Sequence, residues 1–172
     1  MKVLLIRHGE PRYDEIRARG YHGFRYDFGR LTAEGVLQAK KAAEDPILKG
    51  ATIIISSPYT RSLQTAAIIS RITQIELTVE NDVHEWMPEI DYANKNTKNS
   101  YDEYILNRGQ ETTNKSTNWE TVEALRKRVI NAITPYKKEH EKIIVVCHGM
   151  VMSAMTNFDD LIEYCEIREI EI

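Results

Sequence analysis

Four side chains that could bind and transfer a phosphoryl group lie in three short polar motifs that are far apart in the sequence. They are Arg7, His8, Arg61 and His148. An arginine offers a planar, permanently charged fork that suits phosphate oxygens. Neighbouring cations lower the pKa of an imidazole, and a neutral imidazole is a nucleophile. These residue types indicate a site for a phosphoryl dianion in which a histidine attacks phosphorus.

Each motif follows a short apolar run of the kind that is buried on both faces of a parallel sheet. The runs cover residues 2–6, 51–56 and 142–147. Parallel strands bring their carboxyl ends to one edge of the sheet, where open α/β folds place the ligand crevice. We therefore expect the motifs to meet there, with His8 and His148 in the same site.

Helical patterns separate the first predicted strands. Thr32 can cap a helix that reaches about Glu44. Ser57 is predicted as the N-cap of a second helix, with Pro58 at its first position and its end near Ser70.

The second half of the chain continues this alternation. Thr117 and Glu120 have the spacing of a capping box at the start of a long helix, and residues 149–155 begin a short helix. Further strands are predicted over residues 75–79 and over the charged segment 164–172, which suits a sheet edge. Strands that alternate with helices predict an α/β fold, a three-layer α/β/α arrangement with a mostly parallel central sheet.

Two segments depart from this pattern. Residues 11–30 are predicted as a loop with one helical turn, and residues 81–118 as a polar cap or insertion that would influence substrate choice. The polar character of the second segment is strongest over Asn94–Ser100. The first segment carries five arginines, which form either a solvated face or contacts with a second anionic group on a substrate. They are Arg12, Arg17, Arg19, Arg25 and Arg30.

Length and charge limit the functional classes. A chain of 172 residues fits one domain, residues 1–172. A net charge of -3 offers no general attraction to nucleic acid or anionic lipid, and the longest apolar run, Ile143–Cys147, is too short to span a bilayer. We expect a cytoplasmic protein with no nucleic-acid or membrane partner. The edge strand over residues 164–172 could pair with a second copy to form a homodimer.

The cysteines do not indicate a structural framework. Cys147 and Cys165 form neither a disulfide pattern nor a CxxC pair. Cys147 directly precedes His148, where a thiol beside cations could be redox-sensitive. Its place in a buried strand favours the alternative, a small hydrophobic residue.

Four sequence blocks resemble the histidine phosphatase (phosphoglycerate mutase-like) superfamily, in its phosphatase branch. They are Arg7–Glu10, Leu31–Ala39, Ser56–Ala66 and Val146–Gly149. The Arg-His-Gly tripeptide at residues 7–9 would be weak evidence by itself, whereas four blocks in the family's order are strong evidence. The resemblance implies that His8 accepts the phosphoryl group as a phosphohistidine. Arg7, Arg61 and His148 would bind its oxygens and stabilise the transition state.

The resemblance also implies a proton donor. Glu85 is similar to the family's acidic residue that protonates the leaving oxygen, and an alkoxide leaves poorly without that proton. The same carboxylate would then activate the water that hydrolyses the phosphohistidine. The residues after Glu85 depart from the family's spacing, so Glu89 is an alternative donor.

These roles imply that a metal-independent hydrolase cleaves a small phosphorylated substrate, a phosphomonoester, with no cofactor. Phosphoglycerate-mutase-type transfer is an alternative, although Pro11–Asp14 replaces the Trp-Asn pair usual in mutases. A non-catalytic phosphate- or phosphopeptide-binding module would keep Arg7 and Arg61 but would not require His8 as a free base. A zinc hydrolase that used both site histidines is disfavoured, because two arginines would oppose a bound cation.

Overall fold

The computed structural model describes residues 1–21, 23–90, 99–111 and 118–172. Within these ranges five strands form one sheet in the order β3-β2-β4-β1-β5. They are β1 (Lys2–Arg7), β2 (Ile54–Ser56), β3 (Leu77–Val79), β4 (Lys142–Cys147) and β5 (Ile167–Glu171). β1 to β4 are mutually parallel, and β5 runs antiparallel to β1 at an edge. The predicted, mostly parallel sheet with a charged edge strand is confirmed.

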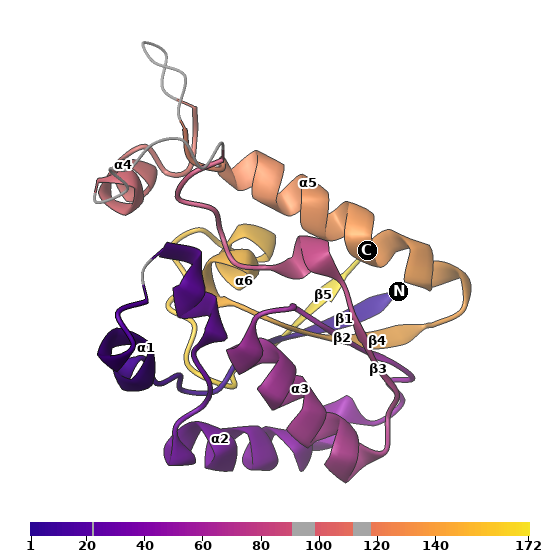
Figure 1. Cartoon of the computed structure of the whole chain (residues 1–172). Helices are drawn as coiled ribbons and strands as arrows, with labels where there is room; N and C mark the ends of the chain where they lie inside the picture. The colour runs from indigo at the N-terminus through magenta and orange to yellow at the C-terminus, as the bar shows by residue number, and fades with distance from the viewer. Residues whose placement is uncertain (22, 91–98, 112–117) are drawn as a thin grey trace.

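Helices cover both faces of this sheet (Figure 1). α2 (Ala33–Ala43) and α3 (Thr60–Thr73) lie on one face, and α5 (Val122–Ile133) and α6 (Gly149–Met155) lie on the other. The short helices α1 (Asp14–Ala18) and α4 (Ser100–Leu106) lie beyond the carboxyl ends of the strands. The predicted three-layer α/β/α fold is therefore confirmed. No helix in the described part of the chain has both the length and the apolar composition that crossing a bilayer requires.

The strands are apolar throughout because each of their two faces is covered. In β1, Val3 and Leu5 pack into the core cluster that includes α5 and α6, whereas Leu4 and Ile6 pack into the cluster that includes α3. All four side chains are fully buried. Successive residues of a strand point to opposite faces, so a strand between two helical layers needs an unbroken apolar run.

Cys147 belongs to this core. Its side chain is fully buried in the same cluster as Val145 and Val151, and burial raises the pKa of its thiol. The environment matches the interpretation of this residue as a small hydrophobic side chain.

Two predicted helix starts are wrong, and tertiary contacts explain both. Thr32 caps α2 as expected by accepting from the amide of Gly35. In contrast, α3 has Tyr59 at its N-cap, because the hydroxyl of Ser57 forms a turn and contacts His148 Nε2 at 2.8 Å.

The other wrong start is that of α5. Its N-cap is Thr121, whose side chain accepts from the amide of Ala124. Thr117, the other half of the expected capping box, lies outside the described residues. Glu120 does not close a capping box but forms an ion pair with Arg128.

The segment 81–118 attaches to the core through aromatic side chains. Trp86, Tyr104 and Trp119 are almost completely buried. The ring of Tyr104 lies 4.9 Å from that of Trp86 and 5.4 Å from that of Trp119, measured between centroids. The polar stretch over residues 94–100 lies almost wholly outside the described ranges, which resume at Asn99.

Two facing glycines let the start of α2 contact the loop that follows β1. A Cβ atom on Gly35 would lie 2.3 Å from the carbonyl oxygen of Glu10, and one on Gly9 would lie 2.5 Å from that of Gly35. Both distances are far shorter than a normal contact, so only glycine fits at either position.

Gly35→Ala should therefore displace the loop after His8 and destabilise the protein. Overpacking of this kind costs about 1–3 kcal/mol of unfolding free energy, measurable by urea denaturation. Lys40→Ala, at an exposed position of the same helix, is the control and should change stability by less than about 0.5 kcal/mol. A Gly35→Ala protein as stable as this control would contradict the close approach.

Candidate active site

Strand pairing brings the two motif histidines together. β1 and β4 are adjacent and parallel, with Arg7 opposite Cys147. One residue further, the amide of His8 donates to the carbonyl of Cys147 at 3.0 Å. The rings of His8 and His148 consequently lie 5.2 Å apart in an edge-to-face arrangement. The sequence prediction that these distant residues meet at one sheet edge is confirmed.

The hydrogen bonds of His8 define its tautomer. Nδ1 lies 2.8 Å from the carbonyl oxygen of Gly9, which can only accept, so Nδ1 carries the proton. Nε2 accepts from Nε of Arg61 at 3.1 Å and therefore holds the lone pair. Burial, reinforced by the charges of Arg61 and Arg7, lowers the pKa of His8 to about 3. His8 is thus a neutral imidazole with its unprotonated nitrogen toward a guanidinium.

The loop after His8 is fixed from two helices. The amide of Gly9 donates to Thr65 Oγ1 of α3 at 3.0 Å. The amide of Glu10 donates to Gln38 Oε1 of α2, and the Glu10 carboxylate accepts from the hydroxyl of Thr32. These bonds hold the imidazole in place before any substrate binds.

His148 is also neutral. Its pKa lies well below the usual value, first because the ring is buried and then because Arg61 and His8 lie nearby. Nε2 lies 2.8 Å from Ser57 Oγ and 3.4 Å from Ser62 Oγ. Nδ1 is buried, and no described residue hydrogen-bonds to it. In the tautomer in which the Ser57 hydroxyl donates to Nε2, Nδ1 carries the proton and is a buried donor without a partner among the described residues.

Arg61 comes from the first turn of α3 and is almost completely buried. Besides His8, its guanidinium contacts Asp27 Oδ1 at 3.1 Å and lies over the ring of Tyr59 at 5.1 Å. Burial raises the pKa of Asp27, and the ion pair with Arg61 opposes that shift. Sequence reasoning missed Asp27, because it lies in the short 3-10 helix Gly23–Phe28 within a segment that shows no motif.

Arg7, which directly precedes His8, is held by a backbone carbonyl and an aromatic ring. One Nη donates to the carbonyl of Ile162, and the guanidinium stacks on the ring of Tyr164, 4.2 Å from its centroid. Nε is buried and has no hydrogen-bond partner among the described residues. The arginine is therefore oriented by contacts from the C-terminal part of the chain while one donor stays unused.

Glu85 is a second carboxyl group, besides Asp27, that lies near these cations. Burial raises its pKa, opposed by the amide of Trp86, which donates to Oε1 at 2.8 Å, and by the charges of Arg61 and Arg7. Glu85 and Arg7 line a common pocket of about 450 Å³, whose described lining does not include Glu89. Of the two candidate proton donors, Glu85 is the one that lines a pocket together with Arg7.

Three tyrosines near the site groups were missed as site residues, and two of them contact the histidines. The ring of Tyr164 lies 5.9 Å from that of His8, and the ring of Tyr59 lies 5.2 Å from that of His148. Burial raises the pKa of Tyr13, with smaller effects from site groups that include Arg61 and Glu85. Of the three tyrosines, only Tyr59 lies in a sequence motif.

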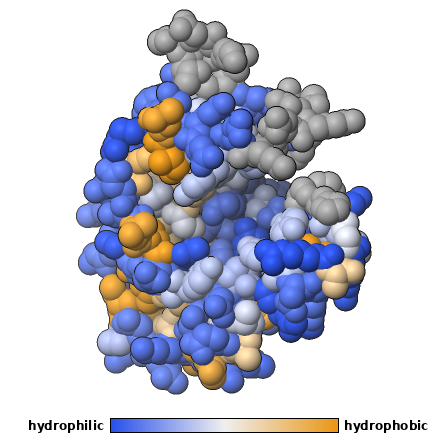
Figure 2. Space-filling model, turned by 90° about the vertical axis from the view of Figure 1, so that its left-hand side faces the viewer, coloured by the Kyte–Doolittle hydropathy of each residue, from blue (hydrophilic) through white to orange (hydrophobic). Residues whose placement is uncertain are grey.

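At the carboxyl ends of the strands the surface is hollowed and largely hydrophilic (Figure 2).

Two of the five arginines in residues 12–30 form surface ion pairs. Arg12 donates to both carboxylate oxygens of Asp14, and Arg30 donates to both oxygens of Glu15. These pairs belong to the outer surface of α1, which favours the solvated-face interpretation for them. No group of three or more His, Cys, Asp or Glu side chains in the described ranges is arranged to hold a metal ion.

The neutral state of His8 predicts how stability depends on pH. The pKa is 6.5 in the unfolded chain and about 3 in the folded protein. Unfolding therefore takes up a proton between these values, and stability falls as the pH drops below about 6.5. One such group accounts for a loss of about 1–2 kcal/mol between about pH 7 and pH 5. His8→Gln should show a loss smaller by that amount in urea unfolding, whereas equal losses would mean that His8 is not held neutral.

The chain is similar in sequence to curated proteins. A curated relative from Hydrogenobacter thermophilus (strain DSM 6534 / IAM 12695 / TK-6), provisionally named phosphoserine phosphatase 2, is 28% identical over 159 residues, covering 90% of this chain and 76% of that protein. One from Proteus mirabilis (strain HI4320), provisionally named phosphoglycerate mutase GpmB, is 36% identical over 85 residues, covering 49% of this chain and 38% of that protein.

Solved structures share the fold. The mycobacterial glucosyl-3-phosphoglycerate phosphatase in complex with VO3 has a TM-score of 0.69 and 18% identity, covering 99% of this chain and 90% of that chain. The alpha-ribazole phosphatase from Shigella flexneri has a TM-score of 0.70 and 22% identity, covering 100% of this chain and 91% of that chain. The family model of the histidine phosphatase superfamily (branch 1) matches residues 3–161. The chain therefore belongs to the histidine phosphatase superfamily.

Proposed function

We propose that this protein is a phosphomonoesterase that transfers a phosphoryl group from its substrate to His8 and then to water. The state of His8 carries the proposal, because its Nδ1 proton bonds to the Gly9 carbonyl while the lone pair of Nε2 faces Arg61. A neutral imidazole beside cations suits attack on a phosphoryl dianion. Membership of the superfamily and relatives named as phosphatases support this function.

In the first step, Nε2 of His8 attacks phosphorus while the bond between phosphorus and the leaving oxygen breaks. Arg61 turns from Nε2 to the phosphoryl oxygens, where Arg7 and Nδ1–H of His148 also bind and stabilise the developing charge. The protonated carboxyl group of Glu85 gives its proton to the leaving oxygen. The product alcohol leaves as a neutral molecule, and the phosphohistidine stays on the protein.

In the second step, water attacks phosphorus and the N–P bond breaks. The carboxylate of Glu85 takes a proton from the water, inorganic phosphate is released, and Nε2 of His8 regains its lone pair. A carboxyl group whose pKa is raised by burial suits both roles. Arginine and histidine supply the positive charge, and we propose that no metal ion takes part.

The pocket beside Arg7 suggests the class of leaving group. Its apolar lining includes Tyr101, Ile105, Met150, Phe158 and Ile162, and the carboxylates of Asp159 and Asp160 line it as well. Arg7 is the one basic side chain in its described lining. A carboxylate on the leaving group would lose water there without gaining a cation, since Arg7 is used by the phosphoryl group. An uncharged, partly apolar leaving group fits better.

The mechanism predicts that the effect of Glu85→Gln depends on the leaving group. For propyl phosphate, whose alkoxide needs a proton, kcat/KM should fall about 10²- to 10⁴-fold. For 2,4-dinitrophenyl phosphate, whose phenolate leaves without one, kcat/KM should fall far less. In the parent protein, kcat/KM for propyl phosphate should also fall as the pH rises above the pKa of Glu85. This alkaline limb of the pH profile should be absent in Glu85→Gln.

His8→Ala is the matching test of the nucleophile. It should abolish turnover of both esters, and the phosphohistidine detected by ³¹P NMR in the parent should be absent. Activity should survive dialysis against EDTA. Turnover that persists in His8→Ala, or that requires added metal, would overturn the mechanism.

A substrate panel tests the leaving-group assignment. Release of phosphate from uncharged alkyl or aryl phosphates should exceed that from 3-phosphoglycerate by about 10- to 100-fold in kcat/KM. Conversion of 3-phosphoglycerate into 2-phosphoglycerate, without release of phosphate, would instead support the mutase function suggested by the partial match to GpmB.

A further inference from the structure

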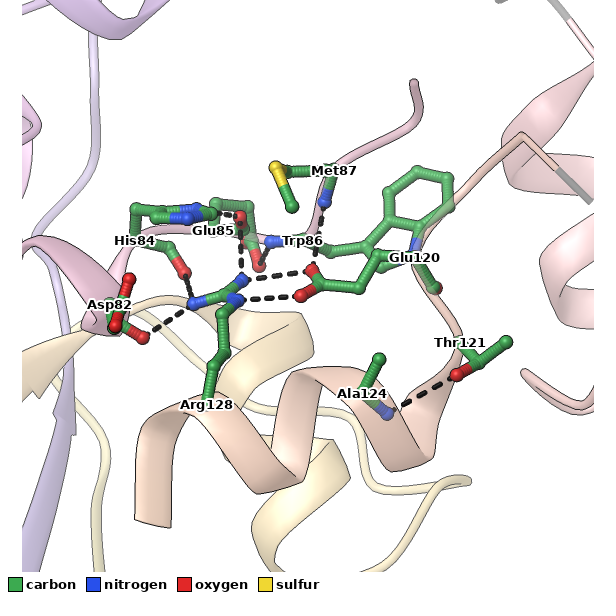
Figure 3. A network of polar contacts seen from close by, with 9 residues as sticks. All are labelled: Asp82, His84, Glu85, Trp86, Met87, Glu120, Thr121, Ala124 and Arg128. Atoms are coloured by element: carbon green, nitrogen blue, oxygen red, sulfur yellow. Dashed lines mark hydrogen bonds and ion pairs between the residues drawn. The ribbon is translucent and has the colours of Figure 1, made fainter. Parts of the chain in front are cut away.

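We propose that Arg128 and Glu120 form a positioning pair that holds Glu85 in place for proton transfer. The inference rests on the proposed function and adds two residues outside the reacting groups. Arg128 rises from α5 toward the segment that carries Glu85, and Glu120 meets it from the loop before that helix (Figure 3).

All five N–H donors of Arg128 are used. Nε and one Nη bind the two carboxylate oxygens of Glu120, at 2.5 and 2.9 Å. The remaining donors bind backbone carbonyl oxygens at 2.6 Å (Asp82), 2.9 Å (His84) and 3.1 Å (Glu85). One guanidinium thus satisfies three carbonyls across four consecutive residues. Its fixed fork supplies these donors in directions that an ammonium group could not reproduce.

Glu120 holds the other side of the same segment. Its Oε2 also accepts from the amide of Met87 at 3.2 Å, and its backbone carbonyl accepts from the indole N–H of Trp86 at 2.6 Å. The amide of Glu120 donates to the carbonyl of Met87 at 2.9 Å. Glu85 therefore lies between a set of bonds from Arg128 and a set from Glu120.

These contacts replace regular structure. A 3-10 turn, Asn81–Val83, precedes Glu85, and residues 84–87 belong to no helix or strand. Backbone groups in such a segment need partners from elsewhere when they are shielded from water. Arg128 and Glu120 provide them, and both side chains are themselves largely buried, at 13% and 3% exposed.

The pair also keeps its charge from disturbing Glu85. Arg128 bonds to the backbone of Glu85 and not to its carboxylate, which accepts from the Trp86 amide. An unbalanced cation bonded to the backbone of Glu85 would stabilise the Glu85 carboxylate and so disfavour its protonated, acid form. The carboxylate of Glu120 balances the guanidinium, so the segment is held without loss of the proton donor.

Arg128→Lys tests the positioning role. Lysine keeps the positive charge beside Glu120 but cannot reach three carbonyls at once. We expect kcat/KM for propyl phosphate to fall about 10- to 100-fold, since a displacement of about 1 Å has that effect on catalysis. For 2,4-dinitrophenyl phosphate it should change less than about threefold, because that reaction needs no proton from Glu85.

Arg126→Lys is the matched control. Arg126 lies on the same helix and also donates to a backbone carbonyl, that of Ala154 at 2.7 Å, but makes no contact with the Glu85 segment among the described residues. Its conversion to lysine should leave both esters within about twofold of the parent.

Glu120→Gln provides a second readout, which also serves if Arg128→Lys does not fold. It leaves the bonds from Arg128 to the carbonyls but removes the balancing charge. The pKa of Glu85 should fall, and the alkaline limb for propyl phosphate should move about one pH unit lower. The other charged or titratable groups that act on Glu85 or respond to it are unchanged in this variant. They are Arg7 of β1, Tyr13, Arg61 of α3, Tyr104 of α4 and Cys147 of β4. His84, whose Nδ1 contacts the Glu85 carbonyl, also faces Arg128 and Glu120, so its own pKa should fall in this variant.

Three outcomes would overturn the inference. Equal losses on both esters in Arg128→Lys would mean that the pair serves only the fold. Unchanged kinetics would mean that Glu85 does not depend on it, and an unmoved alkaline limb in Glu120→Gln would remove the charge-balancing role. Glu85→Gln, measured in parallel, separates these failures from failure of the proposed function, because loss of leaving-group dependence in that variant would overturn the acid role of Glu85 itself.

Discussion

The parallel pairing of β1 with β4 is the constraint on which the site depends. It places Arg7 opposite Cys147, and the next hydrogen bond, from the His8 amide to the Cys147 carbonyl, fixes where the two histidines leave the sheet. Side chains alternate between the two faces along a strand. A shift of one residue would therefore turn Val145 and Cys147 toward the opposite helices and move His148 away from His8. The buried core that holds the register also sets the geometry of the chemistry.

Burial has opposite effects on the two kinds of titratable group in this site. It lowers the pKa of His8 and His148, because an imidazole is charged when protonated, and it raises that of Glu85, because a carboxyl group is charged when deprotonated. One physical cause therefore favours the uncharged form of all three groups, which is the form that the proposed mechanism needs from His8 and Glu85. The charges of the arginines lower the pKa of the histidines further and oppose the rise in the pKa of Glu85. Carboxylates that pair with the arginines limit both effects of their charge. Asp27 bonds to Arg61 and Glu120 to Arg128.

The sequence predicted features set by local pattern and left out those set by distant contacts. The apolar runs located β1 and β4, and the motif at each carboxyl end located His8 and His148, because strand burial and topology determine both. The start of α3 could not be found locally, since the hydroxyl of Ser57 contacts His148 far along the chain. Asp27 and Tyr164 have no periodicity or motif around them, and only the folded chain brings them to the arginines.

Glu120 shows how a residue with capping-box spacing can take a different role in the fold. Its spacing suits a capping box, where its carboxylate would bond to backbone amides at the start of a helix. In the fold it still accepts from a backbone amide, that of Met87, but on the segment that carries Glu85. Thr121, and not Thr117, caps α5, so the Glu120 carboxylate is available to pair with Arg128 of that helix. The oxygen acceptors that would have helped to begin a helix instead fix the irregular backbone that carries Glu85. An alanine at this position would leave the cap of α5 intact but would leave a buried guanidinium without its counter-charge.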